Sequence, residues 1–88
     1  MAPYDLVQSV GRALDILELV GNSEGGMRRQ TVINLTQLKP ATTYNLLRTL
    51  VAKGFLIKRR NPIRYYLGPT MVSLRRAQRD YELFQRAK

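Results

Sequence analysis

The chain has 88 residues and a formal charge of +9, with 15 Lys and Arg against 6 Asp and Glu. It contains no Cys and no His, which excludes disulfides, thiolate nucleophiles, most catalytic triads and most metal sites. No apolar run approaches the length of a membrane span, and the N-terminus lacks the pattern of a signal peptide. We therefore expect one small, basic, intracellular domain that binds a partner and is not an enzyme, without metal or cofactor.

Three helices are expected in the first two thirds of the chain. The first covers residues 6–20, where apolar side chains recur at helical spacing: Leu6, Val10, Ala13, Leu14, Leu17 and Val20. A short second helix covers about residues 29–36. The third begins at Pro40, since proline fits the first turn of a helix, and ends before Gly54. Its inward stripe consists of Thr43, Leu46, Leu47 and Leu50.

A β-hairpin and a fourth helix follow. Residues 55–57 and 64–67 are expected to form two strands with Asn61-Pro62 in the turn between them. The last helix runs from Thr70 towards Lys88. It carries an apolar stripe that suits pairing with a second copy or packing on the first helix: Leu74, Ala77, Tyr81 and Phe84.

The charge is unevenly distributed along the chain. Residues 1–24 carry a net charge of −3, whereas residues 25–79 contain twelve bases and no acid. A surface with so much charge of one sign favours a polyanionic partner. Nucleic acid is favoured over an anionic membrane. The alternative is a basic face that only contacts water. Asp15 and Glu18 are interpreted as solvated surface, because no His or metal-ligand cluster accompanies them.

Two helices joined by a short turn and followed by a basic hairpin predict a winged helix-turn-helix: a three-helix core, a wing and a C-terminal linker helix. Its third helix would enter the major groove of DNA. Once the inward stripe is assigned, small and polar residues remain outside. Those expected at base edges are Ala41, Thr42, Asn45 and Arg48, where Asn45 can pair with adenine and Arg48 can reach a guanine or a phosphate.

Other residues are expected on the DNA backbone. Lys39 occupies the N-cap of the third helix, where a cation opposes the helix dipole unless a phosphate binds there. The full backbone set is Arg28, Arg29, Lys39, Pro40, Tyr44 and Thr49. The wing adds four cations, Lys58, Arg59, Arg60 and Arg64, for phosphates or a narrow minor groove. Alternatively, charges on an edge strand protect it from aggregation.

Two other functions remain open at this stage. A winged helix can serve as a protein-interaction module, although the third helix here is basic and begins with small residues. The domain could instead bind RNA by stacking Tyr65 and Tyr66 on bases. Alternation along the strand places one of these two rings in the core beside Leu67.

The residues also resemble a known family. Residues 9–18 (Ser-Val-Gly-Arg-Ala-Leu-Asp-Ile-Leu-Glu) are similar to the opening helix of IclR-type transcription regulators. Residues 38–50 resemble that family's recognition helix, and 54–56 (Gly-Phe-Leu) with 65–68 (Tyr-Tyr-Leu-Gly) resemble its wing. Gln37 departs from the pattern, because it stands where the family usually has Gly in the turn.

The resemblance implies a particular organisation. Residues 1–5 would be a flexible N-terminus, 6–68 the winged helix-turn-helix domain, and 69–88 a linker and dimerisation helix, with the effector domain absent. Members of the family bind double-stranded operators as dimers, and repress or activate genes when a metabolite binds the second domain. The expected protein is thus the DNA-reading domain of a cytoplasmic, nucleoid-associated prokaryotic regulator that acts as a homodimer on a palindromic site. A small molecule would act only through the missing domain.

Overall fold

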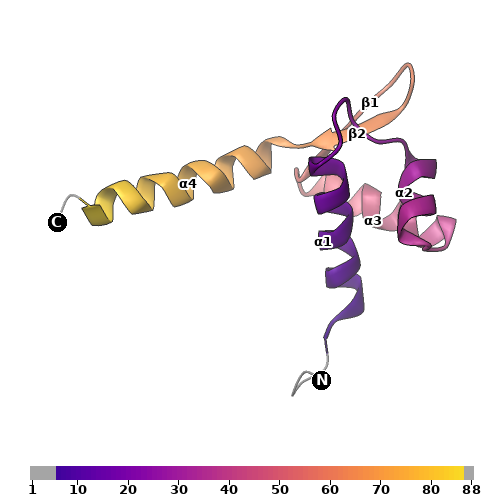
Figure 1. Cartoon of the computed structure of the whole chain (residues 1–88), viewed down its shortest axis with the longest axis horizontal. Coiled ribbons are helices and arrows are strands. Elements are labelled where there is room, and N and C mark those ends of the chain that lie inside the picture. Colours follow the sequence, from indigo (N-terminus) through magenta and orange to yellow (C-terminus); the bar gives the residue numbers. More distant parts are fainter. Residues whose placement is uncertain (1–5, 87–88) are drawn as a thin grey trace.

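The computed structural model describes residues 6–86, apart from three side chains in the last helix. Its elements are α1 (Gln8–Gly21), α2 (Arg29–Thr36), α3 (Pro40–Ala52), β1 (Leu56–Arg59), β2 (Arg64–Leu67) and α4 (Pro69–Arg86). Figure 1 shows α1, α2 and α3 gathered in one body, with α4 extending away from it. The expected order of four helices and one hairpin is confirmed. The predicted N-terminal segment 1–5 and the side chain of Phe84 lie outside the described residues.

The first helix buries only part of the face that its apolar spacing predicts. Ile16 and Val20 are buried in α1, whereas Leu6, Val10 and Leu14 are 75%, 55% and 53% exposed. The predicted stripe is therefore wrong over its first half. Apolar residues surround most of the circumference of α1, so helical periodicity alone does not determine which side faces the core.

The turn between α2 and α3 contains one left-handed residue. Gln37 has a φ of 61°, and its backbone N–H donates to the carbonyl of Ile33 at 2.9 Å. This region of φ favours glycine, and a residue with a Cβ is disfavoured there by about 1 kcal/mol. The side chain compensates in part, because Nε2 of Gln37 donates to the carbonyl of Asn34 at 2.9 Å. The turn thus forms with Gln37 in the place of the expected Gly.

One apolar cluster holds the body together. Its buried members come from the three helices, both strands and the loop before α2: Ile16, Val20, Met27, Val32, Leu47, Leu50, Leu56 and Tyr65. The third helix contributes Leu47 and Leu50 to this cluster. Thr43 is buried on the same side of the helix and Leu46 packs partly buried against the cluster, so the predicted inward stripe is confirmed. A fully buried Leu contributes about 1.5–3 kcal/mol, so these contacts fix the rotation of α3 about its axis.

The hairpin is tied to the loop between α1 and α2. Within the hairpin, β1 and β2 pair antiparallel with Leu56 opposite Leu67. Met27 pairs with Tyr65 on the outer side of β2 through two backbone hydrogen bonds of 2.8 and 2.9 Å. The loop approaches so closely that a Cβ on Gly26 would lie 2.7 Å from the ring of Tyr66. The sequence gives no strand signal at Met27, and this third pairing was not expected.

The last helix begins at a tight junction with the end of α3. The backbone N–H of Gly68 donates to the carbonyl of Phe55 at 2.8 Å, and that of Thr70 to the carbonyl of Gly54 at 3.0 Å. Thr70 Oγ1 also donates to the carbonyl of Lys53 at 3.2 Å. A Cβ on Gly68 would collide with the Gly54 carbonyl, so only glycine allows this approach. The start of α4 is thereby hydrogen-bonded to the turn that follows α3.

Thr43 provides a test of the core. Its side chain is fully buried, and Oγ1 has no hydrogen-bond partner among the described residues. An unpaired buried hydroxyl costs about 1–3 kcal/mol, so we expect Thr43→Val to raise the free energy of unfolding by about 1 kcal/mol. Equilibrium unfolding in urea measures this change. Thr43→Ser keeps the hydroxyl and loses a methyl group, and should be less stable than the wild type. A loss of stability in Thr43→Val would contradict the assignment.

Candidate nucleic-acid interface

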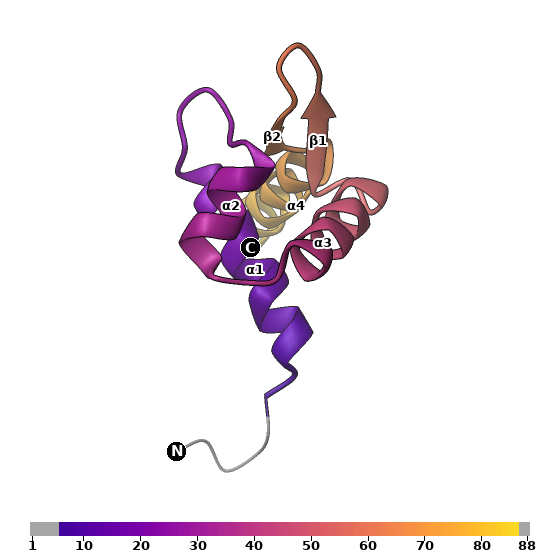
Figure 2. The same cartoon turned by 90° about the vertical axis from the view of Figure 1, so that its right-hand side faces the viewer.

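The outer face of α3 carries the side chains that the sequence assigned to base edges. Ala41, Asn45 and Arg48 are exposed, and Thr42 is half-buried on the flank of the same helix. The exposed face lies opposite the residues that enter the core. Figure 2 shows α2 and α3 side by side on one side of the body, with the hairpin projecting beyond them. An exposed helix of this kind fits the major groove of B-DNA.

The N-terminus of α3 lacks a side-chain cap. Lys39 is the N-cap residue with extended backbone angles (φ −64°, ψ 144°), Pro40 is the first helical residue, and no side chain hydrogen-bonds to the free amides. Lys39 and Pro40 are both exposed. A cation at this end opposes the helix dipole. An anion bound to the amides would be stabilised both by the helix dipole and by the ammonium group of Lys39. The expected N-cap position of Lys39 is confirmed, and the site is suited to a phosphate.

Two arginines from different helices meet one tyrosine. The guanidinium carbon of Arg29, the first residue of α2, lies 5.6 Å from the centre of the Tyr44 ring. The guanidinium carbon of Arg48 lies at the same distance from that ring. Each cation–π contact at an exposed position contributes about 0.5–1 kcal/mol. The spacing of Tyr44 and Arg48 along α3 could have indicated their contact, but Arg29 arrives only through the packing of α2 on α3.

Beneath this group lies the phenol of Tyr65. Only 3% of Tyr65 is exposed, and burial raises its pKa, while Arg29 lowers it and Tyr44 raises it by smaller amounts. Tyr66 is half-buried, with its ring against Gly26. The expectation that one of the two tyrosines packs into the core is confirmed, and it is Tyr65. A buried ring of this kind offers no stacking platform to an RNA base.

The hairpin concentrates positive charge. Lys58, Arg59 and Arg60 are exposed and Arg64 is half-buried. Arg59 lies directly opposite Arg64 in the strand register. Like charges in this position destabilise a hairpin by about 0.2–1 kcal/mol, unless an anion neutralises them. The cations predicted for the wing therefore do gather on the hairpin.

The remaining predicted residues lie in several places. Arg28 is the exposed N-cap residue of α2, beside Arg29. Thr49 is exposed, but its hydroxyl already donates to the carbonyl of Asn45 at 2.8 Å. The residues predicted for dimerisation lie on α4, which extends away from the side occupied by α2 and α3 (Figure 1). They are thus separate from the basic face.

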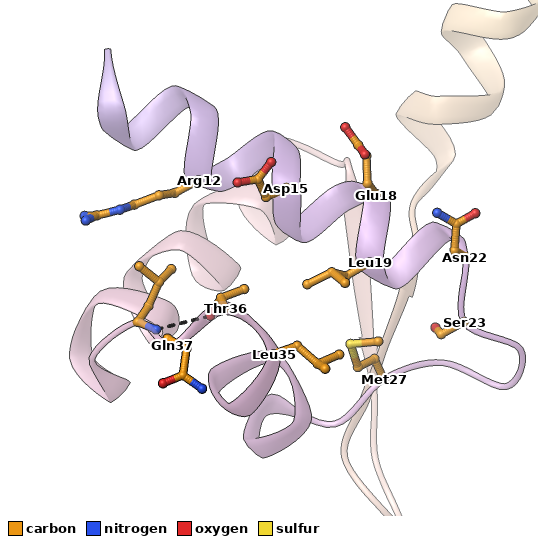
Figure 3. A pocket seen from close by; sticks show the side chains of 11 residues that line it. Arg12, Asp15, Glu18, Leu19, Asn22, Ser23, Met27, Leu35, Thr36 and Gln37 are labelled. Carbon is orange, nitrogen blue, oxygen red and sulfur yellow. Dashed lines mark hydrogen bonds between the residues drawn. The ribbon is translucent and has the colours of Figure 1, made fainter. Parts of the chain in front are cut away.

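The acidic side of α1 borders an open hollow of about 890 Å³ between α1 and α2. Figure 3 shows Leu19, Met27 and Leu35 around this hollow, while the carboxylates of Asp15 and Glu18 do not converge on one point. Both carboxylate residues are exposed. Among the described residues, no group of three or more metal-ligating side chains is found, and no helix is long and apolar enough to cross a membrane.

The fold and this basic face define the class of protein: a winged helix-turn-helix domain that binds DNA. The family model of the IclR helix-turn-helix domain matches residues 9–60, and the chain belongs to this family of transcription regulators. Its fold is similar to that of an IclR family transcriptional regulator from Brucella abortus, with a TM-score of 0.73 and 23% sequence identity. The match covers 89% of this chain and 31% of that one, so the chain spans less than a third of that regulator. No match was found among curated proteins.

The wing allows stability and binding to be separated. Arg64→Gln removes the like-charge pair with Arg59, so we expect the free energy of unfolding to rise by about 0.2–1 kcal/mol. The same change should weaken binding to duplex DNA and lower the salt slope of log affinity by about 0.9. Thermal unfolding and fluorescence anisotropy titrations measure the two effects. Arg79→Gln on α4 removes the same charge far from the wing and serves as control. Equal effects of the two variants on DNA binding would contradict a specific role of the wing.

Proposed function

We propose that this domain recognises a defined sequence of double-stranded DNA and is the DNA-reading part of a regulator that responds to a metabolite. One observation carries the proposal. The outer face of α3, its uncapped N-terminus and the start of α2 carry exposed cations, and the hairpin that projects beyond them adds four cations, so that these elements form a basic face (Figure 2). Such a face matches the phosphates of a duplex, and an exposed helix at its centre matches the major groove.

The α3 residues closest to the bases would be Ala41, Thr42 and Asn45. Ala41 and Thr42 stand in the first turn of α3, where small side chains allow close approach. Asn45 follows one turn after Ala41 on the same side, and an amide can form two hydrogen bonds to adenine. Thr42 can contact a thymine methyl. Arg48, one turn beyond Tyr44, reaches either a guanine or a phosphate.

Contacts to the DNA backbone would hold this helix in register. Lys39 and the amides behind it suit a phosphate at the start of α3. Arg28 and Arg29 would contact the DNA strand whose backbone α2 crosses. Pro40, Tyr44 and Thr49 on α3 would also contact the DNA backbone. The four wing cations would contact phosphates on the flank, or place an arginine in a narrow minor groove. Most of these contacts carry no sequence information, but they supply most of the affinity.

A homodimer on a palindromic site would complete the specificity. Leu74 and Tyr81 on α4 are 53% and 62% exposed, a large apolar area for a helix that extends from its own body. Val10 and Leu14 are exposed on α1 and line an apolar groove between α1 and α3. A second copy of the chain can cover both the apolar stripe of α4 and the groove between α1 and α3 in an isologous interface. Ala77 and Phe84 complete the α4 stripe predicted from the sequence.

The whole regulator would be longer than this chain. The match to the similar solved regulator covers 31% of that chain, which leaves room there for a second domain that would bind the metabolite. The proposed protein is a cytoplasmic, nucleoid-associated regulator, and any small molecule would act through that second domain. No catalytic step, metal or cofactor is assigned to the described domain.

Asn45 tests sequence recognition. A duplex is first selected by the wild-type domain from a pool of randomised duplexes, and its affinity is compared with that of a mixed-sequence duplex of equal length. We expect Asn45→Ala to reduce the preference for the selected duplex by about 1–3 kcal/mol at one base pair, with little change on the mixed sequence. Gln78→Ala removes an exposed amide from α4 and is the matched control. Equal losses on both duplexes would assign Asn45 to the backbone.

The dimer is tested by sedimentation of the free domain. We expect the wild type to associate at high micromolar concentration, and Tyr81→Asp to shift it towards the monomer, because a carboxylate in an apolar interface is strongly disfavoured. Arg79→Ala, on the opposite side of α4, should leave the association unchanged. A wild-type domain that remains strictly monomeric at this concentration would contradict a self-sufficient dimer.

A further inference from the structure

The contact of Arg29, Tyr44 and Arg48 joins α2 to α3 at the centre of the basic face. Both guanidinium carbons lie 5.6 Å from the centre of one ring, so the two cations are no more than twice that distance apart. The ring itself is 39% exposed, and both arginines are exposed. The three side chains thus form a group on the surface that the packing of α2 on α3 brings together.

This group has positive charge and hydrogen-bond donors, and the stretch of sequence that supplies it contains no acid. No Asp or Glu occurs between residues 25 and 79 of the sequence, and burial raises the pKa of the nearby Tyr65 phenol above its ordinary value, so this phenol supplies no negative charge. The π face of Tyr44 attracts each guanidinium but does not neutralise it. Each arginine has five N–H donors in a planar fork that suits oxygen anions. An anion with several oxygens would relieve the repulsion and accept these donors.

The position of the group on α3 separates it from the base-reading row. Tyr44 and Arg48 form one i, i+4 row, which meets α2 through Arg29, whereas Ala41 and Asn45 form the neighbouring i, i+4 row. In helix-turn-helix complexes the helix before the recognition helix crosses the DNA backbone. Since Arg29 belongs to that helix and contacts the same ring as Arg48, both guanidiniums are directed to the backbone side of α3.

We propose that Tyr44 is a positioning residue that holds Arg29 and Arg48 as one binding site for the phosphate backbone of DNA. Arg48 accordingly contributes affinity and not sequence preference, and the bases are read by the Ala41–Asn45 row and Thr42. This inference rests on the proposed DNA-binding function. It adds a role for Tyr44, which acts through the two arginines, and it decides between the guanine and the phosphate as the partner of Arg48.

The arginines are tested on the selected duplex and on the mixed-sequence duplex of equal length. We expect Arg29→Ala and Arg48→Ala each to weaken binding to both duplexes by the same factor, about tenfold. Each should lower the salt slope of log affinity by about 0.9 and leave the ratio of the two affinities unchanged. Asn45→Ala is the contrasting control, since it should change that ratio. A loss of the ratio in Arg48→Ala would overturn the assignment of Arg48 to phosphate.

The role of Tyr44 is tested by substitutions that remove no charge. Tyr44→Phe keeps the ring, and we expect it to bind both duplexes like the wild type. Tyr44→Leu removes the ring and should weaken binding to both by about fivefold, and it should have no further effect when Arg29 and Arg48 are both alanine. An equal loss in Tyr44→Phe, or a loss from Tyr44→Leu that persists without the arginines, would overturn the positioning role. Thermal unfolding of each variant confirms that the domain is folded.

These outcomes are distinct from a failure of the proposed function. A folded wild-type domain that binds neither duplex would overturn the proposed function, and this inference with it. A wild type that prefers the selected duplex, combined with an Arg48→Ala variant that loses this preference, would overturn the inference alone.

Discussion

The packing of α3 against the core determines the rest of the DNA-facing surface. Thr43, Leu47 and Leu50 are buried, and because they lie on one side of α3 they allow a single rotation of that helix. A helix rotated by one position would expose Leu47 and bury a charged or polar neighbour. Losing the burial of one Leu and desolvating one polar group would together cost several kcal/mol, on the order of the two effects added. The identity of the outward side chains is therefore a consequence of the apolar contacts behind them.

The same constraint explains how a small domain can tolerate so much unbalanced charge. The cations of the basic face are supplied by α2, α3 and the hairpin, and these elements are held together by one apolar cluster and by the pairing of Met27 with Tyr65. Arg59 opposite Arg64 and Lys39 at a helix N-terminus are each unfavourable in the free domain. A duplex bound to this face, as proposed, would relieve this repulsion, so part of the binding free energy would come from repulsion already present in the free domain.

Local rules predict much of this structure from the sequence, and tertiary contacts account for the rest. The element order, the buried face of α3 and the N-cap position of Lys39 follow from spacing, proline and glycine. The rotation of α1 about its axis does not follow from these rules. Leu14 and Ile16 are both strongly apolar, and only the packing of α1 against α3 and β2 determines that Ile16 is the buried one. The contact of Arg29 with Tyr44 could not be predicted for the same reason, because it depends on how α2 packs against α3.

The junction at Gly68 links α4 to the end of α3, and through α3 to the basic face. Three hydrogen bonds join the start of α4 to the segment between Lys53 and Phe55, where α3 ends. A shift of the base of α4 relative to that segment would break these hydrogen bonds, and the close approach of Gly68 to the Gly54 carbonyl leaves little room for it. In a dimer that pairs through α4, the separation of the two α3 helices is then set by the angle between the two α4 helices. In that proposed dimer, the half-site spacing of about one helical turn of DNA would depend on the junction at the C-terminal end of α3.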